Sequence, residues 1–178
     1  MLSVVKKISN KIFKSLVSNE CYARRQGVEI GFNCRLYIKS WGSEPYLIKI
    51  GDEVTIASGV RLLTHDGATC LVKNNSGQRY YKYGRINIGD RVFVGMNAII
   101  MPGVTIGNNV IVGAGSIVTK DVPSNSVIGG NPAKIIISYS DYEEKTKESF
   151  TTITDLNINK EEKVKQFISI IEGKVDNG

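Results

Sequence analysis

The chain has 178 residues, of which 42% are hydrophobic and 22% charged, an ordinary composition for one folded domain with short additions. Its three cysteines stand far apart and it has one histidine, so we expect neither a disulfide framework nor a metal site. The net charge of +6 suits a solvated basic surface or a phosphate-bearing ligand. Without a basic stripe interleaved with aromatics, we expect no nucleic-acid partner.

The first residues predict an amphipathic helix over residues 3–17. Lysines surround one apolar face, which consists of Val5, Ile8, Ile12 and Leu16. We expect residues 1–27 to form a helical cap over the strand edges of the domain that follows. A weak membrane-surface association through these lysines stays an open alternative. The segment lacks the apolar run of a signal peptide, and the sequence has no run long enough to span a bilayer, so we expect a cytoplasmic protein.

A six-residue repeat dominates residues 28–136. In its main block, β-branched aliphatic residues recur at every sixth position: Ile88, Val94, Ile100, Ile106, Val112 and Val118. Small or β-branched residues follow each of these by four positions: Val92, Ala98, Val104, Val110, Ser116 and Val122. The pattern begins weakly at Ile30 and is clear at Ile50, Ile56 and Leu62. A period of six fits neither an amphipathic helix nor a hairpin meander. It predicts a mainly β solenoid in which three hexads close one triangular coil around an aliphatic interior.

The turns and interruptions of the repeat carry further expectations. We expect positive φ angles at turn residues such as Gly51-Asp52, Gly89-Asp90 and Gly107-Asn108-Asn109. The register slips by two residues between Leu36 and Ile50, and an excursion over residues 66–85 leaves it altogether. Long excursions from a rigid scaffold are where function concentrates.

Beyond residue 136 the hexads stop. We expect residues 137–178 to form a tail that contains a helix over residues 161–173. Apolar residues keep helical spacing there, namely Val164, Phe167, Ile168 and Ile171. Residues 139–160 give no clear prediction.

Four segments resemble the hexapeptide-repeat acyltransferase family, and within it the O-acetyltransferases of sugars and polysaccharides found with surface-polysaccharide biosynthesis. They are GSEPYLIKIGD (42–52), LLTHDG (62–67), VGAGSIVTKDVP (112–123) and GGNPAKII (129–136). The resemblance covers roughly residues 28–136. It implies a left-handed parallel β-helix, a homotrimer with active sites between subunits, and acetyl-CoA as the co-substrate. The left hand comes from the resemblance alone, because ordinary parallel crossovers are right-handed.

The chemistry that the resemblance implies is acetyl transfer to the hydroxyl of a small or lipid-linked sugar. Such a transfer needs a base that takes the acceptor's proton, and imidazole suits this role near neutral pH. His65 is the one histidine, and its segment aligns with the family's general base. Asp66, Glu44 and a backbone carbonyl are candidates for orienting its second ring nitrogen. Cys70 as an acyl-enzyme nucleophile is disfavoured, because the family transfers the acyl group directly.

The resemblance also implies contacts with coenzyme A. Ala114, Thr119 and Lys120 occupy positions that contact coenzyme A in relatives. Met96 stands at the same corner one coil earlier, where relatives often have a smaller residue, so we expect a backbone contact there. Lys134, like Lys120, suits the nucleotide phosphates by its charge.

The acceptor site and the exact function stay open at this point. Arg79 and Tyr81 of the excursion, and Trp41 of the slipped segment, are candidate acceptor ligands; a trimer contact is the alternative for the excursion. N-acylation of an amino sugar or another small amine is an alternative reaction, and a catalytically silent β-helix scaffold is an alternative without catalysis. A solenoid carbonic anhydrase is excluded, since it needs three histidines per zinc and the chain has one.

Overall fold

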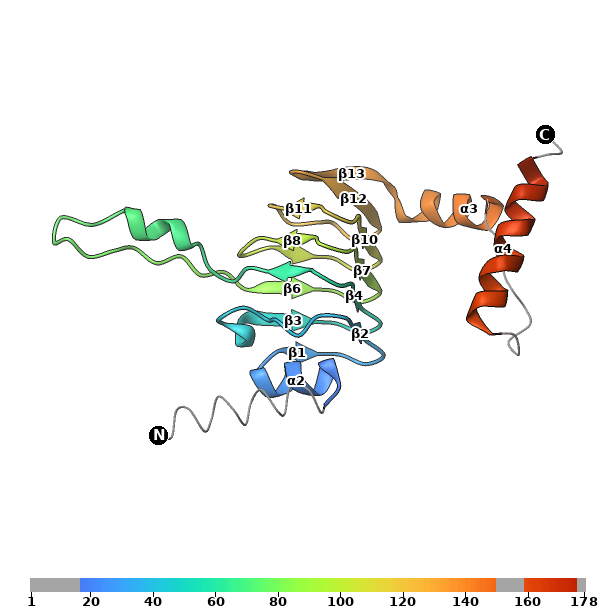
Figure 1. Cartoon of the computed structure of the whole chain (residues 1–178). Coiled ribbons are helices and arrows are strands. Elements are labelled where there is room, and N and C mark those ends of the chain that lie inside the picture. The colour runs from blue at the N-terminus through green and yellow to red at the C-terminus, as the bar shows by residue number, and fades with distance from the viewer. Residues whose placement is uncertain (1–16, 150–158, 176–178) are drawn as a thin grey trace. The chain divides into compact units, whose positions relative to one another are not determined.

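The computed structural model describes residues 17–149 and 159–175 (Figure 1). The chain divides after Ser140 into two compact units. The helix expected over residues 3–17 lies outside the described residues apart from its last position.

The first described helix is α2 (Asn19–Gln26). At its start the hydroxyl of Ser18 accepts a hydrogen bond from the backbone N–H of Cys21. At its end Gly27 takes a left-handed conformation with φ of 100°, which glycine adopts without steric cost. Both helix ends are therefore fixed by local sequence, and α2 lies beside the first strands of the sheets (Figure 1).

The described strands form three sheets that the chain visits in turn, so that each sheet collects strands from successive circuits (Figure 1). The four-stranded sheet consists of β1 (Glu29–Ile30), β3 (Ile48–Ile50), β6 (Ile86–Ile88) and β9 (Thr105–Ile106). The three-stranded sheet consists of β5 (Arg61–Leu62), β8 (Ile99–Ile100) and β11 (Ile117–Val118). The six-stranded sheet consists of β2 (Arg35–Leu36), β4 (Thr55–Ile56), β7 (Val92–Val94), β10 (Val110–Val112), β12 (Ser126–Gly130) and β13 (Ala133–Ser138). All paired strands run parallel except β12 and β13, which form an antiparallel hairpin at the end of the stack.

The hexad residues fill the space between the three sheets. Every aliphatic residue at the sixth positions and every small residue four positions later is buried. Strand residues of this set stack on their equivalents in the next circuit, as Ile88 does on Ile106 and Val94 on Val112. Burial of one such side chain stabilises the fold by about 1.5–3 kcal/mol, so this row is the main source of stability. The predicted mainly β class and the predicted interior are confirmed.

The expectation of positive φ at the Gly-Asp turns is wrong at most of the named positions. In these three turns the residues with positive φ are Glu53, Arg91 and Asn109, and of these only Asn109 was expected. The glycines of these turns serve a different need, which is space. A Cβ atom on Gly51 would collide with the carboxylate of Asp90 in the next circuit, and Gly31 and Gly89 are confined in the same way.

The polar turn residues that crowd these glycines form a hydrogen-bonded corner ladder, made of Asp52, Asp90, Asn108 and Ser124. Each side chain accepts a hydrogen bond from a backbone N–H one circuit earlier. The N–H of Asp52, for example, donates to Oδ1 of Asp90 at 2.8 Å. The corner ladder thus satisfies turn amides that the strands leave unpaired.

Two interruptions shape the surface. In the first circuit, the segment between β2 and β3 forms no strand in the three-stranded sheet, and it ends in the short 3-10 helix η1 (Pro45–Leu47). After β5 the excursion projects from the stack as a long arm (Figure 1). The arm contains η2 (Gly67–Leu71) and antiparallel bridges that join His65 to Tyr83 and Lys73 to Arg79.

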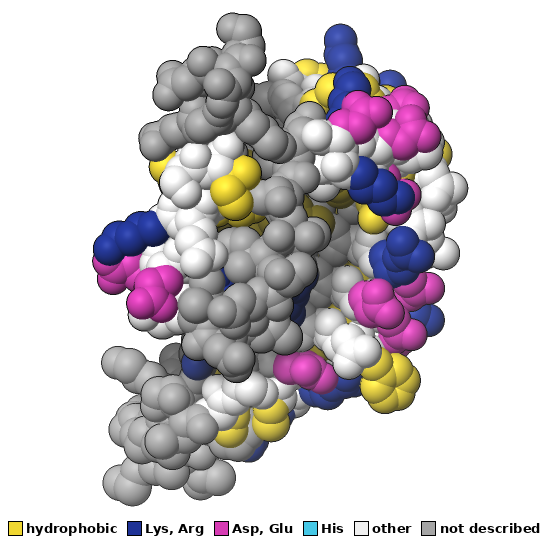
Figure 2. All heavy atoms as spheres, turned by 90° about the vertical axis from the view of Figure 1, so that its right-hand side faces the viewer, with side chains coloured by type: hydrophobic (Ala, Val, Ile, Leu, Met, Phe, Trp, Pro, Cys, Tyr) yellow, Lys and Arg dark blue, Asp and Glu magenta, His cyan; other side chains and the backbone are white. Residues whose placement is uncertain are grey.

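The last part of the chain contains α3 (Tyr139–Ser149) and α4 (Lys160–Val175). Helix α4 covers the range where helical spacing of apolar residues predicts a helix. Within residues 17–149 and 159–175, the helices are too short or too polar to cross a membrane. On the face shown in the space-filling view, basic and acidic side chains of the described residues are interspersed (Figure 2).

Candidate active site

His65 and Glu44 form a pair at the base of the arm. His65 follows β5, and Glu44 directly precedes η1 in the slipped segment. Nδ1 of His65 lies 2.9 Å from Oε2 of Glu44, and the hydroxyl of Thr64 donates to the same oxygen at 2.6 Å. The Glu44 side chain is only 15% exposed, whereas that of His65 is 45% exposed. The carboxylate of Glu44 is thus largely shielded from solvent, whereas the imidazole of His65 faces solvent.

The hydrogen bond from Thr64, followed by that from His65, lowers the pKa of Glu44 from its ordinary value of 4.5. At neutral pH Glu44 is therefore an acceptor only, and we assign the proton of the neutral imidazole to Nδ1. This tautomer leaves the lone pair on Nε2, the nitrogen that does not face Glu44. The arrangement suits removal of a proton from a bound ligand.

Of the two carboxylates considered as partners of the imidazole, the structure pairs Glu44 with it. The carboxylate of Asp66 instead accepts a hydrogen bond from the backbone N–H of Ala68 at 3.0 Å and caps η2. Asp66 and His65 are neighbours in extended backbone, where successive side chains point to opposite faces.

A cavity of about 310 Å³, here called the histidine cavity, lies beside the imidazole. Its lining includes Leu63, His65, Asp66, Lys82, Met101 and Thr119. Leu63, Met101 and Thr119 each directly follow stacked strands of the three-stranded sheet, which explains why they meet on one wall. The cavity is lined by both His65 and Thr119. The sequence predicts that His65 acts on the acceptor and that Thr119 contacts coenzyme A. Lys82 was not among the expected site residues, because its position in the arm has no repeat register to indicate it.

The remaining expected coenzyme A residues are exposed on later circuits. Met96 and Ala114 lie at one corner, where the carbonyl of Met96 accepts a hydrogen bond from the N–H of Gly115 at 2.8 Å. Lys120 directly follows Thr119, and Lys134 lies in β13 opposite Gly129. The structure does not place Lys134 in the wall of the histidine cavity.

The arm carries a row of rings that begins at His65. Tyr83 lies 6.1 Å from the imidazole, Tyr81 stacks on Tyr83 at 6.3 Å, and the guanidinium of Arg79 lies 4.3 Å above Tyr81. The two expected acceptor residues of the arm are thus part of one stack. Trp41 is different: it is 3% exposed and belongs to the hydrophobic core. Its placement gives it an anchoring role in this chain rather than a surface on which an acceptor could rest.

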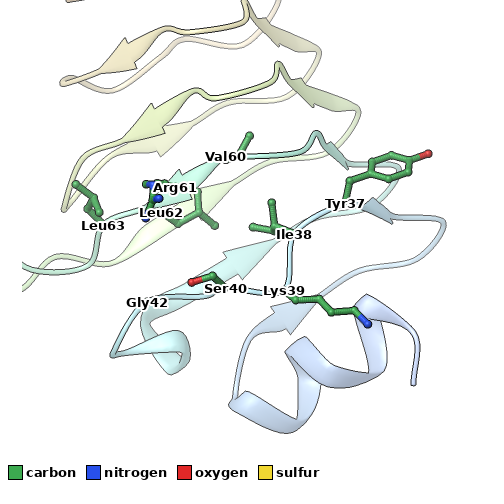
Figure 3. Close-up of a pocket in the computed structure, with 10 residues that line it drawn as sticks. Tyr37, Ile38, Lys39, Ser40, Gly42, Val60, Arg61, Leu62 and Leu63 are labelled. Carbon is green, nitrogen blue, oxygen red and sulfur yellow. The ribbon is translucent and has the colours of Figure 1, made fainter. Parts of the chain in front are cut away.

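A second cavity, here called the Arg61 cavity, has a volume of about 400 Å³ (Figure 3). One wall is the slipped segment, residues 37–40 and Gly42, and the other is residues 59–63. Leu63 lines both this cavity and the histidine cavity. The sequence shows the slip in register, but not that it opens a cavity.

Comparison with known proteins shows which family the repeat belongs to. The family model described as bacterial transferase hexapeptide (six repeats) matches residues 85–120. Protein CapG of Staphylococcus aureus is 48% identical over 158 residues, which cover 87% of this chain and 91% of CapG.

Two solved structures extend the comparison to the fold. A maltose O-acetyltransferase from Clostridium difficile matches with a TM-score of 0.53 at 30% identity, over 74% of this chain and 83% of that one. A galactoside acetyltransferase in complex with coenzyme A matches with a TM-score of 0.51 at 29% identity, over 75% of this chain and 63% of that one. The hexads, the three stacked sheets and these similarities lead to one conclusion: the chain belongs to the hexapeptide-repeat acyltransferase family.

Proposed function

We propose that this protein is an acetyl-CoA-dependent O-acetyltransferase that acts on a sugar hydroxyl in surface-polysaccharide biosynthesis. The observation that carries the proposal is the His65–Glu44 pair at the wall of a cavity that Thr119 also lines. The similarity to a maltose O-acetyltransferase and to a galactoside acetyltransferase supports a sugar acceptor.

In this mechanism His65 is the general base. Its Nε2 takes the proton of the acceptor hydroxyl while the oxygen attacks the thioester carbonyl carbon. The carbon–sulfur bond breaks, and the departing thiolate receives the proton that His65 holds, directly or through solvent. Glu44 keeps the ring in the required tautomer and stabilises the imidazolium while it is protonated. Base catalysis of this kind contributes about 10²- to 10⁴-fold.

Acetyl-CoA supplies the activated acyl group, and the exposed corner of Met96 and Ala114, which precedes β8 and β11, suits its amide-rich arm. Ala114 is small and exposed between Gly113 and Gly115, so a long ligand can lie close to the backbone there. We assign backbone contacts to Met96 and Ala114, a side-chain contact to Thr119, and phosphate contacts to Lys120 and Lys134.

The assembly and the winding complete the proposal. We propose a left-handed β-helix over residues 28–136, between a cap of residues 1–27 and a tail of residues 137–178. We further propose a homotrimer that works in the cytoplasm, where acetyl-CoA is made, with each histidine cavity between two subunits. The exposure of apolar side chains on the arm, such as Leu71 at 84%, supports its burial against a second subunit.

The test is thiol release from acetyl-CoA with a panel of sugars, amino sugars and nucleotide sugars. We expect acceptor-dependent release that falls roughly a hundredfold or more in His65→Ala. Cys70→Ala is the matched control, because Cys70 is exposed on the arm and direct transfer does not use it. Equal rates for wild type and His65→Ala would refute the mechanism, and loss of activity in Cys70→Ala would favour an acyl-enzyme. Amine products without ester products would replace O- by N-acetylation.

A further inference from the structure

We propose that the Arg61 cavity selects acceptors that carry an acidic group, either a phosphate or a carboxylate, and that Arg61 binds this group. The inference rests on the proposed function, since it names the class of acceptor that reaches His65.

The cavity exists because the first circuit omits a strand. β5 pairs with β8 along one edge, and no described strand pairs with its other edge. The slipped segment passes below that edge without forming a ladder, and the buried ring of Trp41 fixes it in the core. Figure 3 shows Lys39 and Ser40 on the slipped segment, and above them Val60 followed by Arg61 and Leu62 of β5. The walls of the cavity are therefore the slipped segment and the region of β5 rather than the arm.

The position of the cavity suits the acceptor side of the reaction. Leu63 separates it from the histidine cavity, and His65 follows Leu63 by two residues. Gly42, in the opposite wall, has its Cβ position 3.8 Å from the hydroxyl of Thr64, which binds Glu44. A ligand seated here approaches the imidazole from earlier circuits, whereas Thr119 approaches it from later ones. Two substrates that enter by these two cavities meet at His65.

The charge of the cavity sets the class of acceptor. Lys39 and Arg61 both line it, and among the described lining residues no side chain is acidic. Arg61 is exposed on β5 and makes no hydrogen bond or ion pair with another described residue. A guanidinium offers a planar fork of donors that matches a carboxylate or a phosphate. Tyr37 and Leu63 are exposed side chains that also line the cavity, and they can contact the face of a sugar ring while the fork holds the acid.

A binding experiment on the full chain tests the inference without relying on catalysis. Glucose, glucose 1-phosphate and glucuronic acid would be titrated calorimetrically into wild type, Arg61→Gln and Arg35→Gln. Arg35 is the matched control, since it lies in the six-stranded sheet and outside both cavities. We expect at least one acidic ligand to bind wild type and Arg35→Gln about tenfold or more tighter than glucose, and Arg61→Gln to lose this preference. Preference for glucose 1-phosphate identifies a phosphate as the group, and preference for glucuronic acid identifies a carboxylate.

The inference is overturned if wild type shows no preference for either acidic ligand, or if Arg61→Gln keeps it. Transfer assays with the same ligands separate this failure from failure of the proposed function. Acetylation of acidic sugars with an unchanged KM in Arg61→Gln would leave the function standing and remove the inference. Acid binding at Arg61 without transfer to any acceptor would remove the function instead. An Arg61→Gln effect confined to the KM of acidic acceptors is the expected result.

Discussion

Glu44 and His65 stand 21 residues apart in the sequence, yet Oε2 of one lies 2.9 Å from Nδ1 of the other. They meet because both belong to interruptions of the repeat: Glu44 to the slipped segment and His65 to the base of the arm. The single circuit between them, formed by β3, β4 and β5, fixes the distance from one interruption to the other. The catalytic pair is thus positioned by the scaffold, although neither residue belongs to a strand.

The pairing makes Glu44 a positioning residue whose loss affects catalysis more than binding. We expect Glu44→Gln to lower kcat roughly a hundredfold and to leave KM for acetyl-CoA within about threefold. Steady-state kinetics of thiol release would measure both. Asp66→Asn is the control, because it retains an oxygen that can cap η2 and does not contact the imidazole. A similar loss in both variants would show that Asp66 shares the role.

The lowered pKa of Glu44 predicts a pH dependence of stability. A carboxyl with a lower pKa folded than unfolded stabilises the fold above the unfolded value, and this contribution is lost as the pH falls through the folded value. The hydrogen bond from Thr64 is the largest cause of the shift. We therefore expect the free-energy difference between wild type and Thr64→Val to be constant from pH 6 to 8 and to shrink below about pH 4.5.

Urea unfolding at a series of pH values would measure that difference. A difference that grows in acid would contradict the sign of the shift, and one that stays constant would mean that the Thr64 hydrogen bond does not favour the ionised form.

The corner ladder predicts a graded response at Asp90. Replacement by alanine removes the acceptor of the Asp52 N–H and should cost about 0.5–1.5 kcal/mol. Replacement by asparagine keeps an acceptor oxygen, as Asn108 does one circuit later, and should cost less. Chemical unfolding of both variants would compare them. Equal losses would mean that the ladder acts through its charge and not through the hydrogen bond.

The crowding of the turn glycines predicts a strong effect of a single methyl group. A Cβ on Gly95 would lie 2.5 Å from the backbone nitrogen of Ala114, whereas one on Gly67 would meet nothing within 4 Å. We expect Gly95→Ala to lose about 1–3 kcal/mol of stability and Gly67→Ala to stay within about 0.5 kcal/mol of wild type. Thermal unfolding would measure both. A neutral Gly95→Ala would show that the circuits can separate at this corner.

The interior could be predicted from the sequence because the hexad pattern reports directly on it. Ile88 and its equivalents are aliphatic and stand six residues apart, as expected if their side chains stack in one interior. The structure confirms that they are buried. The turns were harder, because a glycine looks the same in the sequence whether it serves a positive φ or a close approach. Gly51 and Gly89 serve the second purpose, and the left-handed conformation falls on Glu53 and Arg91 instead.

The candidate site is harder to predict where the choice between residues depends on their three-dimensional placement. His65 follows from the composition and its segment, but the choice between Glu44 and Asp66 depends on whether the slipped segment turns Glu44 toward the ring. Trp41 shows the opposite problem: an aromatic residue in an interruption suggests ligand binding, yet it is buried. The Arg61 cavity results from a missing strand, and a one-dimensional pattern does not report where such a gap opens.

The hairpin of β12 and β13 has a consequence for assembly. A repeat of identical hexads does not by itself limit the number of circuits. The exposed strand edges of the last circuit could then pair with those of another molecule. By reversing direction, β13 presents an antiparallel edge there, on which a parallel circuit cannot continue in register. The hairpin therefore prevents end-to-end pairing of molecules into fibres. It also fixes the length of the corner along which an extended substrate can lie.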